Sequence, residues 1–233
     1  NIDEILRSLR ALQMSDEEGV AAVEFEGVVE RSADWQTRLT PFEDFCHREG
    51  PLSLSTIVET MADSHSTIIY QALFQPMADW TARADERRQA LETHRDTFGG
   101  KLTHSLFGPA DETVTLSTSE EARIEELKAR DARHSFVCNA RAIAVGPDDP
   151  EEFAHQLVDA FADVSHTCYA IEGCVSSGKR AQNVVDAVRD RTVHPPRYGR
   201  GRNRLPWRRA RSRAIVVDPE EVPNFCVLDR KST

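Results

Sequence analysis

Two stretches with an apolar residue at every second position constrain the fold of this chain most strongly. They are residues 66–75 (STIIYQALFQ) and residues 134–145 (HSFVCNARAIAV). A period of two residues is typical of a β-strand that buries one face. We expect strands at these two stretches and also at 20–30 and 167–172.

Capping chemistry predicts where the helices begin. Asp79 is the expected N-cap of a charged helix at 80–97, and Thr118 with Glu121 forms a capping box for a helix at 119–131. Asp149 precedes Pro150, the residue type favoured at the first helical position, so a third helix follows. Helical spacing of apolar residues predicts a helix at 2–14. We expect further helices at 54–61 and 180–191.

A loop rich in glycine at 98–112 (FGGKLTHSLFGPADE) divides the chain into two halves. We therefore expect an α+β protein of two small subdomains, each a short sheet covered by helices. The expected division is a first subdomain at 1–110, a second at 111–193, an arginine-rich linker or arm at 194–213, and at 214–233 a strand and short helix leading toward an absent motor domain.

Composition narrows the functional classes. The net charge of −10 among 233 residues argues against a wholly basic nucleic-acid binder. No apolar run approaches the roughly 18 residues that span a bilayer, so we expect no membrane insertion and a cytoplasmic location. The five cysteines and eight histidines show no zinc-ligand spacing, so no metal site is expected. The chain begins at Asn1, which suggests a processed chain or a fragment.

Residues 173–180 (GCVSSGKR) spell most of a phosphate-binding loop, G-x-x-x-x-G-K-[ST]. In that motif backbone N–H groups and a lysine surround the phosphates of ATP, and a hydroxyl holds Mg²⁺. An alternative hypothesis is therefore a nucleotide-binding enzyme that uses Gly173, Gly178 and Lys179, with Asp218 at the end of an apolar segment.

Three features oppose this alternative. Arg180 replaces the hydroxyl residue, Glu172 brings a carboxylate close to the phosphate position, and residues 166–172 (HTCYAIE) are half polar, whereas a strand feeding such a loop is apolar on both faces. Asp218 has an alternative role as the N-cap of a short helix. We interpret residues 173–180 as a mimic, and expect no catalytic residue and no cofactor in this chain.

The segment 197–213 (RYGRGRNRLPWRRARSR) carries eight arginines and no acid. Arginines interleaved with aromatic residues suit phosphate contact and base stacking. The alternative is a linker, or an arm that docks on an acidic surface of a neighbouring subunit. The candidate residues for binding DNA or an acidic partner are Arg197, Tyr198, Arg200, Arg202, Arg204, Trp207, Arg208, Arg209, Arg211 and Arg213.

The order of segments resembles a known family. Residues 134–164 (HSFVCNARAIAVGPDDPEEFAHQLVDAFADV), a basic proline-containing stretch, and then residues 213–228 (RAIVVDPEEVPNFCVL) are similar to the region before the motor domain in conjugative type IV secretion ATPases of the HerA/FtsK-type class, with a halophilic-archaeal character. Residues 66–91 also resemble the first subdomain of these proteins, so the resemblance covers roughly residues 66–228.

The resemblance implies a non-catalytic N-terminal portion of a conjugation ATPase, whose ATPase residues would lie after this chain. It also implies a hexamer of the full protein that contacts secretion-channel proteins at the membrane face and transfers DNA or protein. The third alternative is a purely structural interaction module, in which the arginine segment is only a linker.

Overall fold

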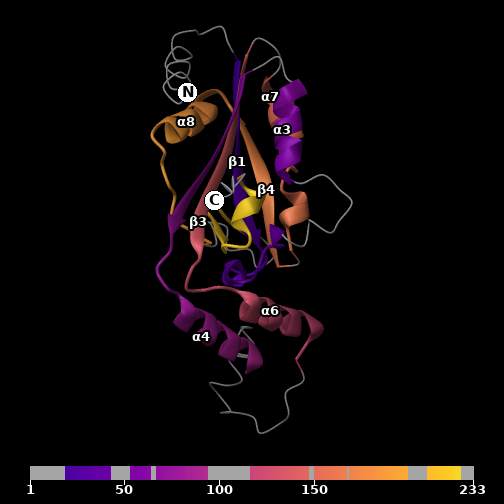
Figure 1. Cartoon of the computed structure of the whole chain (residues 1–233), viewed down its shortest axis with the longest axis vertical. Helices are drawn as coiled ribbons and strands as arrows, with labels where there is room; N and C mark the ends of the chain where they lie inside the picture. Colours follow the sequence, from indigo (N-terminus) through magenta and orange to yellow (C-terminus); the bar gives the residue numbers. More distant parts are fainter. Residues whose placement is uncertain are drawn as a thin grey trace, which may run out of the picture.

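Six antiparallel strands form one sheet in the computed structural model, which describes residues 19–42, 53–63, 67–93, 116–146, 150–166, 168–198 and 209–226. The four long strands lie in the order β2-β3-β1-β4 (Figure 1). Their bounds are β1 Gly19–Val29, β2 Thr67–Pro76, β3 Phe136–Gly146 and β4 Tyr169–Ser177, and the short strands are β5 Ala210–Ser212 and β6 Ile215–Val217.

The four long strands and two helices follow the ferredoxin-like, or split β-α-β, arrangement. Helix α3 (Ser53–Asp63) connects β1 to β2, and helix α7 (Pro150–Gln156) connects β3 to β4. In both connections the chain crosses to a strand that is not its neighbour, and every pairing is antiparallel. This topology is one of the recurring βαββαβ motifs.

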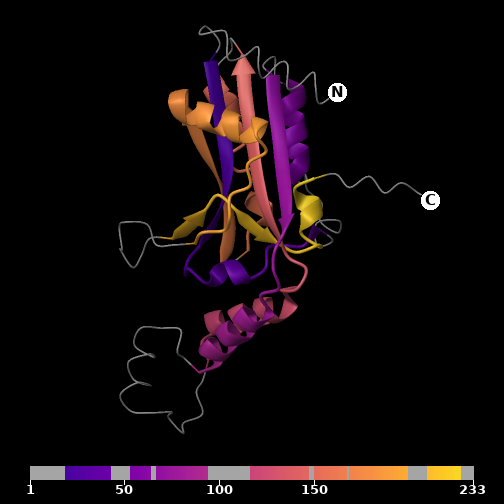
Figure 2. The ribbon, with the colours of Figure 1, turned by 90° about the vertical axis from the view of Figure 1, so that its left-hand side faces the viewer.

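Two helices extend beyond the end of the sheet, between β2 and β3. Helices α4 (Thr81–Glu92) and α6 (Thr118–Ala129) lie together at the lower end of the molecule (Figure 2). Their contact is a small apolar cluster of Leu91, Ile124 and Leu127. The carboxylate of Asp34, after β1, accepts hydrogen bonds from Arg87 of α4 and Arg123 of α6, which joins the helix pair to the sheet.

The C-terminal strands are inserted into the middle of the sheet. β1 and β3 pair only over residues 19–24 and 141–146. Farther along, β1 pairs with β5 and β3 pairs with β6, so residues 210–217 fill the space where β1 and β3 diverge. This insertion gives the backbone groups of the diverging strands new partners, as buried N–H and C=O groups require.

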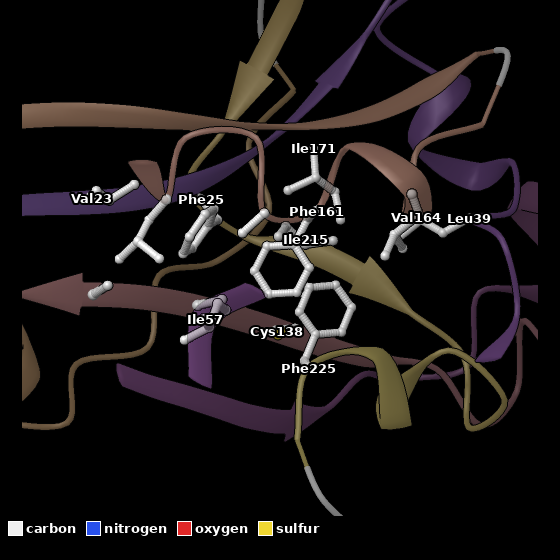
Figure 3. Close-up of a cluster of buried hydrophobic side chains, with 14 of the residues drawn as sticks. Val23, Phe25, Leu39, Ile57, Cys138, Phe161, Val164, Ile171, Ile215 and Phe225 are labelled. Atoms are coloured by element: carbon white, nitrogen blue, oxygen red, sulfur yellow. The ribbon is translucent and has the colours of Figure 1, made fainter. Parts of the chain in front are cut away.

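Helices cover both faces of the sheet. α3 and α7 cover the face that carries the main core, where the Phe25 and Phe161 rings meet edge-on at 4.7 Å and Phe161 stacks on Phe225 at 4.9 Å (Figure 3). The opposite face packs against helix α8 (Gly178–Arg189) through Val184, Val185 and Val188 at one end only. Farther along, that face carries Glu24, Glu26, Asn139 and Arg141 as well as apolar residues.

The expected α+β class is confirmed, but its strands do not form a separate short sheet in each subdomain. β1, from residues 1–110, pairs with β3 and β4 from residues 111–193. Which strands pair is decided by the apolar side chains that they bury together. The alternation of residues within one strand does not show which distant strand becomes its neighbour. The capping box also lies one residue earlier than expected, at Ser117 and Glu120.

Several expectations fall outside the described residues, among them the helix at 2–14 and the N-cap at Asp149. The other described elements are the 3-10 helices η1 Asp34–Gln36, η2 Ala162–Val164 and η3 Val222–Asn224. No helix in the described part of the chain combines the length and apolar character needed to cross a bilayer.

Candidate functional site

The segment that resembles a phosphate loop is not a loop. β4 continues through Ser177 and α8 begins at the next residue, Gly178. Residues 173–177 lie in register with β1, from the pair Gly173 and Phe25 to the pair Ser177 and Ala21. A phosphate loop gathers its N–H groups around one anion, whereas an extended strand directs successive N–H groups to opposite sides.

The backbone N–H groups of β4 are engaged on both sides. Gly173 donates to the carbonyl of Val158 at 3.1 Å, and Ile171 donates to Ser165 Oγ at 3.0 Å, so these residues face away from β1. Because directions alternate along a strand, Cys174 and Ser176 face the β1 ladder. These amides therefore hold the sheet together and are not free to bind phosphate.

The two glycines of the motif have different structural roles. A Cβ at position 173 would lie 2.7 Å from the Cα of Val158, so glycine allows the two backbones to approach closely. Gly178 has φ +56°, a conformation that side-chain-bearing residues rarely adopt, and it makes the abrupt change from strand to helix. Lys179 is exposed on the first turn of α8.

Asp218 lies in a buried ion-pair cluster that does not include Lys179. Its carboxylate is 3.2 Å from Arg130 Nε and accepts hydrogen bonds from the Asp131 N–H and the Ser135 hydroxyl. The expectation that Asp218 caps a short helix is wrong, because Glu221 occupies the N-cap of η3. The side chain of Asp218 instead joins the end of β6 to the turn before β3.

Glu221 completes this cluster, which we call the Arg130 hub. Its carboxylate accepts hydrogen bonds from Arg130 Nη1 at 2.8 Å and from the N–H groups of Leu39 and Asp218 at 2.7 Å each. Arg130 also donates to the carbonyl of Val216. A buried ion pair needs this degree of hydrogen bonding to offset its loss of hydration. The Arg130 hub joins η3, β6 and the end of α6, so its role is structural.

The polar part of the sheet carries three carboxylates, which we call the acidic row: Glu24 and Glu26 of β1, and Glu172 of β4. Glu26 and Glu172 lie directly opposite each other in the register. Like charges in that position destabilise a sheet unless a cation lies between them. Burial raises the pKa of Glu26, and the neighbouring Glu24 raises it further, whereas Arg211 lowers it.

Residues 209–213, the basic strand, supply the countercharge. Arg211 forms ion pairs with both Glu26 and Glu172. Arg209 contacts Glu172 at 3.4 Å, and Arg213 contacts Glu24 at 3.4 Å. The three guanidinium groups alternate along the chain, so they share one face of the sheet and lie over the acidic row.

The other candidate binding residues have different placements. Arg197 is exposed, whereas Tyr198, which was expected to stack on bases, is instead a core residue. The hydroxyl of Tyr198 hydrogen-bonds to that of Tyr169 at 2.6 Å and to the carbonyl of Ala214. Five residues of the proposed set lie outside the described residues: Arg200, Arg202, Arg204, Trp207 and Arg208.

The acidic row was not recognised in the sequence, although a signal for it exists. Residues 23–27 (VEFEG) alternate carboxylate and apolar residues, and residues 209–213 alternate arginine with small residues. Both patterns have the period of a strand. The arginine density and the neighbouring prolines are also typical of an irregular arm, so the strand pattern by itself does not single out these residues.

The described residues contain no group of three or more His, Cys, Asp and Glu side chains that could hold a metal ion. Of their cysteines, Cys138 and Cys168 are buried and Cys174 is exposed. Comparison of the chain with protein-family models, curated proteins and solved structures gives no significant match.

Gly173→Ala should destabilise the fold by roughly 1–3 kcal/mol, because the added methyl group meets the backbone of Val158, in the turn after α7, and backbone atoms cannot move aside cheaply. Urea unfolding measures this change. Ser176→Ala, on the opposite face of the same strand, serves as the control and should be close to neutral. An alanine variant at 173 as stable as the native protein would contradict the proposed packing role.

Proposed function

We propose that this chain is a non-catalytic contact module, corresponding to the N-terminal portion of a conjugation or type IV secretion ATPase. The observation that supports this proposal most is the continuous strand β4, which runs directly into α8 at the phosphate-loop motif. Asp218, the remaining residue of the nucleotide-binding alternative, is held in the Arg130 hub. Both features give the motif residues a structural role.

The order of the elements supports the family part of the proposal. The resemblance expects a strand, a proline-containing turn and a charged helix, and β2 ends at Pro76 before the charged helix α4. It next expects a long strand followed by a helix, which correspond to β3 and α7. We infer that the module works in the cytoplasm and makes contacts with other subunits of a hexamer and with channel proteins at the membrane face.

ATP with Mg²⁺ should leave the melting temperature of the chain unchanged. A ligand at a hundred times its dissociation constant stabilises a fold by about 2.7 kcal/mol, which corresponds to a shift of roughly 5–10 °C for a protein of this size. Differential scanning fluorimetry on the native chain, Lys179→Ala and the surface control Lys128→Ala tests this. Stabilisation by ATP that is lost only in Lys179→Ala would establish the nucleotide-binding alternative.

DNA contact is a second candidate function, and the exposure of the basic strand favours it. Although they pair with the acidic row, Arg209, Arg211 and Arg213 keep 57%, 49% and 58% of their side-chain surface exposed. Half-exposed guanidinium groups can exchange a carboxylate for a phosphate at small cost, since surface ion pairs contribute little. DNA would then compete with Glu172 for Arg209 and Arg211.

If the basic strand contacts DNA, Glu172→Gln should tighten binding, because it releases two arginines from a competing carboxylate. The matched control is Glu59→Gln, which makes the same charge change at an exposed position of α3. We expect Glu172→Gln to bind a DNA duplex several-fold more tightly than Glu59→Gln and with a steeper salt dependence. Fluorescence anisotropy at several salt concentrations measures both, and equal affinities would remove this candidate.

A further inference from the structure

The two outer edges of the sheet differ in how their backbone groups are used. At the β4 edge, the segment after α7 covers the strand: Val158 and Ser165 accept from Gly173 and Ile171, and the N–H of His166 donates to the carbonyl of Tyr169 at 2.8 Å. At the β2 edge, no backbone group from another segment in the described part of the chain pairs with the outer side of the strand.

β2 lacks the features that normally protect an edge strand. All ten of its residues pair with β3 in one continuous register, so the strand is about 33 Å long and has no bulge. Its sequence, TIIYQALFQP, contains no charged residue, and the single proline is at the end. Natural edge strands are usually short, charged or covered, because an open edge adds a further strand readily.

An exposed apolar surface lies beside this open edge. Val58 and Met61 are the exposed large hydrophobic residues of the described chain, with 56% and 38% of their surface accessible. Both belong to α3, which lies behind β2 at the same side of the sheet (Figure 2). Among the residues that the structure describes, the outer backbone groups of this edge have no strand partner, and the apolar side chains of Val58 and Met61 remain exposed beside it.

We propose that a second copy of this chain pairs with β2, antiparallel and edge to edge, so that the sheets of two molecules become continuous across a two-fold axis. A head-to-tail chain of sheets would require the β4 edge, which the protein's own backbone covers. Self-pairing of β2 therefore remains, and it gives a closed pair. The strand has no charge that would repel its copy, and the two α3 helices approach each other, which buries Val58 and Met61.

The alternation of the strand limits the register of this pair. Residues directly opposite must lie on the same face of the sheet, so the residue numbers of a pair must add up to an even number. With Gln71 at the two-fold axis, Ile69 faces Leu73 of the second copy, and Ile68 faces Phe74. With Ala72 at the axis, Gln71 would instead lie opposite Leu73 of the second copy. The polar amide of the glutamine would then contact an apolar side chain, which is the less favourable pair. We assign the axis to Gln71, which places Thr67 opposite Gln75.

This pair rests on the proposed contact function and names a second copy of the chain as one partner. The pair and the non-catalytic proposal can nevertheless fail separately. ATP binding would overturn the non-catalytic proposal without affecting the pair. A monomeric chain would remove the pair and leave the non-catalytic proposal in place. A closed pair is also compatible with a hexamer made of three pairs, which would need a further contact surface.

Sedimentation velocity on the full chain should show a species of twice the chain mass. Thr67→Lys/Gln75→Lys places lysine opposite lysine in the assigned register, whereas Thr67→Glu/Gln75→Lys places glutamate opposite lysine. Both positions are exposed, so circular dichroism should show a native fold for both variants. Because each charge pair occurs twice, we expect the dissociation constants of the two variants to differ about tenfold or more.

Three outcomes would overturn the proposal. They are a native chain that stays monomeric at high micromolar concentration, an assembly with an odd number of chains, or a pair whose dissociation constant is the same in both variants. A pair weakened by lysine opposite lysine and restored by glutamate opposite lysine would establish both the edge and the register, since the alternative register places neither position opposite the other.

Discussion

The pairing of β1 with β4 is the interaction on which the rest of the structure depends. β1 pairs with three other strands, β3, β4 and β5, and its ladder with β4 extends over nine residues of each strand. This ladder includes the whole stretch from Gly173 to Ser177. The same backbone cannot also form a phosphate-binding loop, so the fold of the sheet decides the chemistry of the motif.

Two sets of charges then hold the C-terminal segment in the sheet. The Arg130 hub lies in the interior, where Glu221 and Asp218 surround one guanidinium group and the backbone supplies further hydrogen bonds. The acidic row and the basic strand lie on the surface, where Arg211 separates two opposed carboxylates. The arginine segment therefore belongs in part to the sheet, and its exposed side remains available to a partner.

Much of this structure could be predicted from the sequence. The strands around Ile68 and Cys138 were recognisable because the alternation of their apolar side chains records burial of one face, and Pro150 marked a helix start. The full length of β4 could not be predicted in this way. Its second half contains glycine and serines, and Gly173 is there because Val158, distant in sequence, packs against it. Contacts between residues distant in sequence produce no pattern in the neighbouring residues. For the same reason, the sequence did not show that the two expected sheets are one.

The state of the backbone at residues 173–177 tests the account most directly, and amide hydrogen exchange measures it. We predict slow exchange at Gly173, Cys174 and Ser176 without nucleotide, because Gly173 donates to Val158 and the other two face the β1 ladder, and we predict no change when ATP and Mg²⁺ are added. Fast exchange at these three amides that becomes slow on addition of ATP would contradict it, because the segment would then be a loop that closes around phosphate.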